Sequence, residues 1–215
     1  MVHNLSDQNS VFNHFMAEIR DVNVQKDSMR FRRNMERIGE VLGYELSKTL
    51  NYSNLEVSTP LGIAKTSLLE SQPVVSSILR AGLPLHQGLL NVFDKAENSF
   101  ISAYRKYHKS GDFEIHVDYL ASPNLDGKTL ILADPMLATG SSMVMVYRAL
   151  LQKGTPKKIH IVSAVASKEA VQYVMDEFPI GTELWLGAVD AELTAQSYIV
   201  PGLGDAGDLS FGEKV

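Results

Sequence analysis

The sequence predicts an α/β fold with a mainly parallel central sheet flanked by helices. Three observations support this prediction: short apolar runs alternate with segments of helical periodicity, turn residues bound the apolar runs, and no internal repeat or linker divides the chain. Strands that are joined through helices pair in parallel through right-handed crossovers. The 215 residues, 45% of them hydrophobic, suffice for one buried core, so we expect a single domain over residues 1–215.

The predicted helices place their apolar residues on one face. Between residues 27 and 50, apolar side chains recur every three or four positions, and the same periodicity returns in later segments. The other predicted helices are 85–93, a helix that starts near Ser141 and stops before Gly154 and Pro156, and 168–178. Ser141 or Ser142 is expected to cap the start of its helix, because a hydroxyl oxygen can accept from a free N–H group there.

Apolar runs that are too short for helices predict the strands. These runs are 73–79, 99–106, 129–133, 159–165 and 182–189. Residues 113–119 instead alternate strictly between apolar and polar, which is typical of a half-exposed strand and predicts a protruding hairpin. The glycine-rich segment PGLGDAGD at 201–208 is expected to form a loop over the functional site.

Composition limits the classes of function. A net charge of -5 and a pI near 5.7 argue against a broad phosphate-binding surface, so we expect no nucleic-acid partner and only a local nucleotide site. The chain has no cysteine, which excludes disulfides and thiolate metal sites. We find no signal-peptide pattern and no apolar stretch of membrane-spanning length, so we expect a cytoplasmic protein without a membrane partner.

The segment LILADPMLATGSS at 130–142 joins an apolar strand, an acid and a small-residue loop that begins a helix. The free N–H groups in the first turn of a helix together carry about half a positive charge, so a phosphate monoester fits there. Asp134 would repel a phosphate in direct contact, and we therefore expect it to face ribose hydroxyls or a cation. The spacing alone also allows an N-cap carboxylate in an ordinary strand-to-helix turn.

DPMLATGSS resembles the signature with which type I phosphoribosyltransferases bind phosphoribosyl pyrophosphate (PRPP), and its DPMLATG form is similar to that of uracil phosphoribosyltransferases. Further motifs follow in the family's order: TPLG at 59–62, ILRAGL at 78–83, YR at 104–105 and YIVPGLGDAGD at 198–208. The resemblance begins near Arg20 and Asp21 and covers nearly the whole chain. It implies a type I phosphoribosyltransferase fold with a C-terminal base-binding loop, and pyrimidine salvage in which uracil and PRPP form UMP and pyrophosphate.

The resemblance also implies roles for individual residues. The implied PRPP-binding residues are Arg80, Arg105, Asp134, Pro135, Met136, Leu137, Ala138, Thr139, Gly140, Ser141, Ser142 and Asp205. The implied uracil-binding residues are Ile199, Gly204, Asp205 and Ala206, and those implied in catalysis are Asp205, Arg80 and Asp134. Taken without the resemblance, both arginines are compatible with solvated surface cations and the glycine-rich segment with a surface turn.

Magnesium is the implied cofactor, held chiefly through the phosphates of PRPP and near Asp205. GTP is a possible activator, and a homodimer or a higher homo-oligomer is expected from the family and from the apolar helix faces in the N-terminal quarter. His86 is interpreted as a packed or surface histidine without a catalytic role. The segment 106–123 departs from the family pattern, which leaves the contacts of this hairpin open.

Two other functions are compatible with parts of this pattern. A phosphoribosyltransferase for a purine base or for orotate would share the PRPP loop, but VPGLGDAGD at 200–208 argues against it. A pyrimidine-regulatory protein that binds PRPP and RNA would keep the fold, whereas the acidic charge of this chain disfavours RNA binding.

Overall fold

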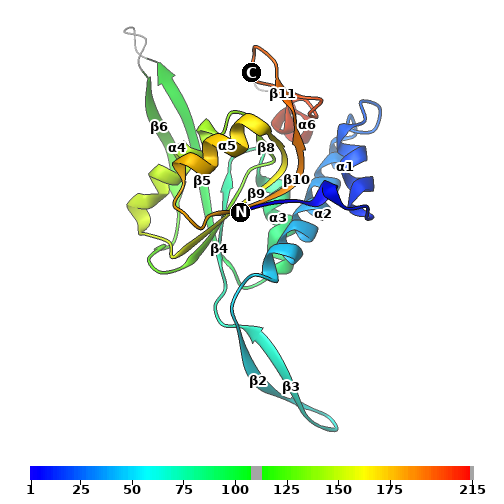
Figure 1. Ribbon diagram of the computed structural model, residues 1–215, viewed down its shortest axis with the longest axis vertical. Helices are drawn as coiled ribbons and strands as arrows, with labels where there is room; N and C mark the ends of the chain where they lie inside the picture. The colour runs from blue at the N-terminus through cyan, green and yellow to red at the C-terminus, as the bar shows by residue number, and fades with distance from the viewer. Residues whose placement is uncertain (108–112, 214–215) are drawn as a thin grey trace.

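A mainly parallel sheet forms the centre of the computed structural model, which describes the backbone of residues 1–107 and 113–213 and the side chains of 1–102 and 118–213 (Figure 1). Neighbouring strands pair in parallel, except that β6 runs antiparallel to β5. The strand order is β1 (Val2–Asn4), β10 (Glu183–Asp190), β9 (Lys158–Ser167), β7 (Thr129–Ala133), β4 (Val74–Ile78), β5 (Glu97–Tyr107) and β6 (Phe113–Ala121), and β8 (Met136–Leu137) also pairs with β9.

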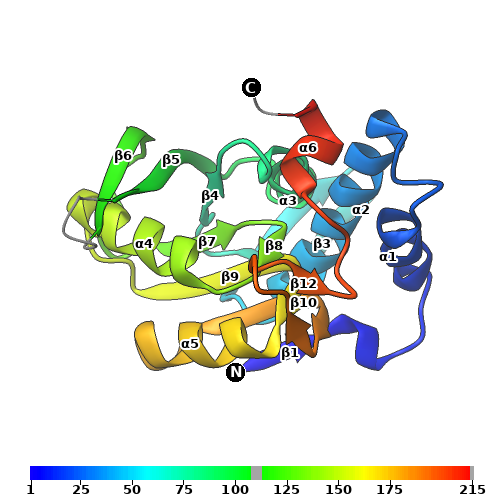
Figure 2. The same ribbon diagram turned by 90° about the horizontal axis from the view of Figure 1, so that it is seen from above.

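Helices cover both faces of the sheet, as Figure 2 shows from above. One core contains buried residues of α1 (Phe12–Arg20), α2 (Ser28–Ser47) and α3 (Leu83–Val92), and the other contains residues of α4 (Ser141–Leu150) and α5 (Lys168–Glu177). Successive residues of the buried strands alternate between these cores: Leu130 and Leu132 pack toward α4, whereas Ile131 packs toward α2. The predicted α/β fold class is therefore confirmed.

Glycines allow α2 and α3 to pack closely against each other. A Cβ atom at Gly39 would lie 2.4 Å from the carbonyl oxygen of Leu85, and one at Gly88 would lie 2.0 Å from the carbonyl oxygen of Glu36. Larger residues would therefore push the helices apart. This packing fixes the start of α3, and with it the loop that connects β4 to α3.

The predicted helices and strands all form, with bounds that shift by a few residues. Asp27 caps α2 by accepting a hydrogen bond from the Arg30 amide at 3.1 Å. The prediction that Ser141 or Ser142 caps α4 is wrong, because Gly140 is the N-cap residue and the serines are the first two residues of the helix. A short 3-10 helix, Leu151–Lys153, follows α4 and ends at Gly154.

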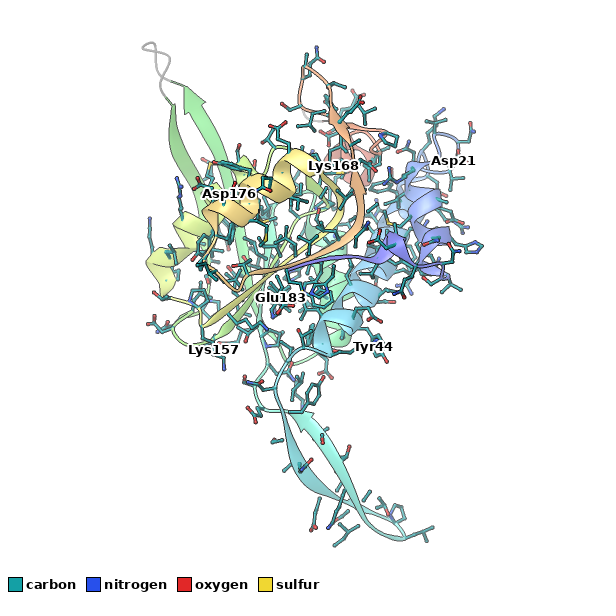
Figure 3. All side chains as sticks on the ribbon, in the orientation of Figure 1. Asp21, Tyr44, Lys157, Lys168, Asp176 and Glu183 are labelled. Atoms are coloured by element: carbon teal, nitrogen blue, oxygen red, sulfur yellow. The ribbon has the colours of Figure 1, made fainter. Side chains whose placement is uncertain are left out.

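Two exposed hairpins and a short C-terminal helix complete the fold. The hairpin of β2 (Tyr52–Thr59) and β3 (Gly62–Leu69) extends away from the body, and its side chains project to solvent on both faces (Figures 1 and 3). The hairpin predicted around residues 113–119 is formed by β5 and β6. The small hairpin of β11 (Glu192–Leu193) and β12 (Ile199–Val200) leads through the glycine-rich segment to α6 (Ala206–Phe211).

Candidate active site

A cleft of about 320 Å³ lies at the carboxyl ends of β4 and β7, where open α/β sheets usually bind ligands. Segments from distant parts of the chain line it, because the topology brings these strand ends to one edge of the sheet. Among its lining residues are nine of the residues singled out in the sequence: Arg80, Asp134, Met136, Ala138, Ser142, Ile199, Gly204, Asp205 and Ala206. The residues implied for PRPP and for the base therefore meet in one cavity.

The loop between β7 and α4 forms a smaller cavity of about 70 Å³ beside this cleft. Gly140 turns the chain into α4 with a φ of 77°, and a Cβ atom there would lie 2.9 Å from a side-chain carbon of Val174. The hydroxyl oxygen of Thr139 accepts from the Ser141 amide at 3.3 Å, which orders the loop just before the helix. The free N–H groups of the first turn of α4 make this cavity suited to an anion.

Asp134 directly follows β7, and its backbone amide donates to the carbonyl of Val162 at 3.1 Å. Burial raises the pKa of its carboxyl group from 3.8 to about 8, because the charged form loses its hydration there. The raised pKa favours the protonated form of this carboxyl group in the ligand-free chain. A neutral carboxyl group beside an anion site avoids the repulsion that a carboxylate would cause.

The loop after β4 carries Arg80 along the rim of the cleft. The Leu79–Arg80 peptide bond is cis, and the Leu79 amide donates to the Ile101 carbonyl at 2.9 Å. A Cβ atom at Gly82 would lie 2.4 Å from the hydroxyl oxygen of Ser77. The packing of the loop against Ser77 therefore requires glycine here, whether or not a ligand also approaches this backbone. The loop is thus fixed at both ends, while the Arg80 side chain remains partly exposed.

The glycine-rich segment is a loop only as far as Asp205, since α6 begins at Ala206. Four residues of this segment, Gly204, Asp205, Ala206 and Gly207, line the cleft. The Oδ1 atom of Asp205 accepts from the backbone amides of Gly207 and Asp208 at 2.8 and 2.9 Å. Asp205 is therefore an N-cap residue, and its other carboxylate oxygen is left for a ligand.

A partly buried ion pair holds this segment against the body. Two guanidinium nitrogens of Arg20 in α1 contact the two carboxylate oxygens of Asp190 at 2.8 and 3.0 Å. Asp190 also accepts from the Gly202 amide at 2.9 Å, and Arg20 donates to the Gly202 carbonyl at 3.2 Å. These contacts link three segments across more than 170 residues and could not be read from local sequence patterns.

The turn between β11 and β12 supplies lining residues that the sequence analysis missed. Ser197 has a φ of 64°, a left-handed conformation that is uncommon for residues other than glycine. The turn is closed by hydrogen bonds between Thr194 and Tyr198, with Thr194 N donating to the Tyr198 carbonyl at 2.8 Å. The cleft is also lined by Ile78, Leu79, Ala81, Tyr198 and Gly207, which belong to the motifs at 78–83 and 198–208 but had no individual role implied.

Some implied PRPP-binding residues lie outside the main cleft. Thr139, Gly140 and Leu137 line the smaller cavity, and the Leu137 side chain is packed in the core, while Pro135 and Ser141 line neither cavity. Arg105 lies in β5, but its side chain falls outside the described side chains. Part of the divergent segment 106–123, residues 108–112, also lies outside the described residues.

His86 is packed away from the cleft. Its Nε2 atom lies 2.7 Å from the Asn98 side-chain oxygen, and burial lowers the pKa of the imidazole. The interpretation of His86 as a packed histidine without a catalytic role agrees with this position. Across the described residues, no helix combines the length and apolar character that a membrane span needs.

Known proteins resemble this chain over nearly its whole length. A family model described as uracil phosphoribosyltransferase matches residues 6–213. A uracil phosphoribosyltransferase of Porphyromonas gingivalis is 53% identical over 211 residues, which cover 98% of each chain. One of Thermococcus gammatolerans is 38% identical over 92% of this chain and 87% of its own.

Solved structures show the same fold. The AQ2163 protein from Aquifex aeolicus matches with a TM-score of 0.85 and 31% identity over the whole of both chains. A hypoxanthine phosphoribosyltransferase from Staphylococcus aureus matches with a TM-score of 0.52 and 15% identity over 86% of this chain and 84% of its own, which supports the fold alone. The nearly complete match to the family model and the identity to its members show that this chain belongs to the uracil phosphoribosyltransferase family.

Proposed function

We propose that the cleft at the carboxyl ends of β4 and β7 is the active site of this phosphoribosyltransferase. As a member of its family, the enzyme transfers the 5-phosphoribosyl group of PRPP to uracil and forms UMP and pyrophosphate. The observation that supports this location is that Arg80, Asp134 and Asp205, which are far apart in the sequence, line one cavity.

The 5'-phosphate is assigned to the loop at the start of α4. Its N–H groups and the hydroxyls of Thr139 and Ser142 can donate to phosphate oxygens, and both residues line the small cavity there. Asp134 lies where the 2' and 3' hydroxyls of the ribose would follow. Because its carboxyl group has a raised pKa, it can both accept and donate hydrogen bonds to a diol.

The pyrophosphate and the base are assigned to the other walls of the cleft. Among the described side chains that line the cleft, Arg80 is the one cation, and it is assigned to the pyrophosphate. Arg105 is proposed as a second pyrophosphate contact. Main-chain groups of Ile199, Gly204 and Ala206 are proposed to read the carbonyl and N–H groups of uracil. Cytosine has an amine donor where uracil has a carbonyl acceptor, so a main-chain N–H group placed to donate to uracil would be left unpaired by cytosine. This mismatch would favour uracil over cytosine.

Magnesium fits this cleft as a metal bound mainly through substrate. The described residues include no cluster of three or more histidine or acidic side chains that would form a metal cage. The free carboxylate oxygen of Asp205 faces the cleft, and one carboxylate with several phosphate and water ligands is the usual environment of Mg²⁺. When bound, the metal would neutralise charge on the pyrophosphate leaving group.

The protein contributes to the reaction mainly by positioning and by electrostatics. A ring nitrogen of uracil attacks C1' of the ribose and its proton passes to solvent, while the bond from C1' to pyrophosphate breaks and negative charge grows on the leaving group. Arg80 stabilises that charge, while the loop at α4 and Asp134 hold the ribose 5-phosphate in place. Neither Asp134 nor Asp205 is assigned as a general base.

Formation of UMP and pyrophosphate from uracil, PRPP and Mg²⁺ tests this proposal, with cytosine, hypoxanthine and orotate as parallel substrates. Uracil-selective, magnesium-dependent product is the expected result. Product from another base would contradict the assignment of the base-reading segment. Omitting Mg²⁺, or replacing it with a chelator, should stop the reaction, and undiminished turnover would remove the metal from the proposal.

The β2–β3 hairpin supports the proposal of a homo-oligomer. It exposes Leu55, Leu61 and Ile63, with Leu61 fully accessible in the isolated chain, and apolar side chains on a protruding arm are suited to a second copy. Sedimentation of the wild type and of Leu61→Ser tests this. Activation by GTP stays a prediction, which addition of GTP to the assay would check. A cytoplasmic location also stays a prediction, which cell fractionation would check.

A further inference from the structure

We propose that Asp208 is a positioning residue that orients the Arg80 guanidinium toward the leaving pyrophosphate. This inference rests on the proposed assignment of Arg80 to pyrophosphate. The two residues are 128 positions apart in the sequence, yet one oxygen of Asp208 lies 3.7 Å from the Nη2 atom of Arg80. The same Nη2 atom donates to the carbonyl of Gly212 at 3.3 Å.

Both contacts come from the same end of the fold. Asp208 lies in the first turn of α6 and Gly212 is the residue that ends this helix, so a single short helix holds the arginine through two acceptors. The helix also packs on the loop itself, because a Cβ atom at Gly207 would lie 3.7 Å from the Cβ atom of Ala81. The base-binding side of the cleft and the Arg80 loop therefore form one unit.

The contacts leave most of the guanidinium free for substrate. Arginine carries five N–H donors in a rigid planar fork, and Asp208 and Gly212 both engage Nη2. With Nη2 held toward α6, the Nε and Nη1 groups remain for phosphate oxygens. Because the fork is planar, fixing one nitrogen restricts the directions of the others. Asp208 thus prepares Arg80 for a ligand without occupying the donors that the ligand needs.

A purely structural role is a poor explanation of this contact. Both side chains are more than a third exposed, at 41% for Arg80 and 36% for Asp208, and exposed ion pairs contribute little to stability. The Oδ1 atom of Asp208 is nevertheless buried without a hydrogen-bond partner, and within the described part of the chain its ion-pair partner is Arg80. The carboxylate is therefore placed to act on the arginine.

A double-mutant cycle on PRPP affinity tests the inference. Dissociation constants for PRPP with Mg²⁺ are measured by calorimetry for the wild type, Asp208→Ala, Arg80→Ala and the double variant. We expect Asp208→Ala to weaken PRPP binding about three- to tenfold in the wild-type background and to have no further effect in Arg80→Ala. Asp208→Asn should fall between, because its amide oxygen can still lie beside the Arg80 guanidinium but carries no charge.

Asp176→Ala on α5 is the matched control, since it removes an exposed carboxylate far from the cleft (Figure 3). It should leave PRPP affinity unchanged. An equal loss from Asp208→Ala with and without Arg80 would overturn the inference, as would unchanged affinity in Asp208→Ala and Asp208→Asn. Unchanged PRPP affinity in Arg80→Ala would instead overturn the assignment of Arg80 itself. If Asp208→Ala unfolds, Asp208→Asn carries the same cycle.

Discussion

The two sides of the cleft are built in different ways. The phosphate side is one continuous segment, residues 134–142, in which a strand, a turn at Gly140 and the start of α4 together create the anion site. The base side is assembled from separate segments, which the Arg20–Asp190 ion pair and the contacts of α6 hold together. The phosphate side thus depends on local backbone geometry, and the base side depends on contacts between distant residues.

On the proposed assignments, this difference allows the cleft to bind two unlike substrates. A helix start is a rigid anion site that requires little support from the rest of the protein. The proposed recognition of a small planar base by main-chain groups requires a loop that contacts from other segments hold in position. Here Asp190 at the end of β10 holds the loop by accepting from the Gly202 amide. A substitution in the contacts that hold the base side should therefore affect uracil binding more than PRPP binding, and a substitution on the phosphate side should do the opposite.

The largest expected effect is on the base side, from removal of Asp190. Asp190→Ala leaves the guanidinium of Arg20 without its partner and frees the amide of Gly202. Because Arg20 is only partly exposed and loses its charged partner, we expect a loss of about 1–3 kcal/mol in the free energy of unfolding. The KM for uracil should rise more than the KM for PRPP, measured by initial rates and denaturant unfolding. An equal rise in both KM values would show that Asp190 does not support the base side in particular.

On the phosphate side, Asp134→Asn should reduce activity while improving stability at high pH. The folded-state pKa of Asp134 is raised from 3.8 to about 8, so its contribution to stability is fully present below pH 3.8 and is lost as the pH rises through 8. Asparagine cannot ionise, so the variant should be more stable than the wild type at pH 9, and the difference should be much smaller at pH 5. Loss of the ribose contact should lower kcat/KM for PRPP about ten- to a hundredfold.

Thermal unfolding at both pH values checks the stability of Asp134→Asn. A variant that gains no stability at pH 9 would mean that Asp134 ionises freely in the folded chain. Full activity would remove Asp134 from the ribose site.

Acid should weaken the fold at a place remote from both sides of the cleft. Burial lowers the pKa of His160 from 6.5 to about 4, and its Nδ1 atom accepts from the indole N–H of Trp185 at 3.1 Å. Above pH 6.5 this histidine is neutral in both the folded and the unfolded chain. Between pH 6.5 and 4 only the unfolded chain takes up the proton, so stability falls as the pH falls through this window.

Fluorescence of Trp185, the single tryptophan, follows denaturant unfolding at pH 7 and pH 5. His160→Asn, whose side-chain oxygen can still accept from the indole, should lose less stability between these pH values than the wild type. An identical loss in both proteins would assign the acid sensitivity to other groups.

The smallest expected effect concerns the turn at Ser197. Its φ of 64° is unfavourable for serine and free for glycine. We expect Ser197→Gly to raise the free energy of unfolding by about 0.5–1 kcal/mol, whereas Ser197→Ala, which keeps the strained backbone, should not. Chemical denaturation compares the two variants, and equal stability would show that the turn carries no strain.

Local patterns predicted the phosphate side and most of the fold. The periodicity of α2, the apolar run of β7 and the small residues after Asp134 are each contained in one short segment. The predicted serine cap failed because the left-handed turn at Gly140 shifts the helix start by one residue.

Long-range contacts were beyond such patterns. Arg20 and Asp190 are 170 residues apart, and no periodicity marks them as partners. The β2–β3 hairpin was not predicted because it has no buried face, so its strands lack the alternation of apolar and polar residues that a half-buried strand shows. The turn at Ser197 was missed because serine gives no signal of a left-handed backbone.

Turnover by Asp205→Asn tests most directly whether this cleft is the site of UMP formation. Asparagine can still accept from the amides of Gly207 and Asp208, so α6 should keep its cap and the melting temperature should stay near that of the wild type. The account predicts that UMP formation from uracil, PRPP and Mg²⁺ is nearly abolished in this folded variant. Wild-type turnover would contradict it and would place the chemistry elsewhere.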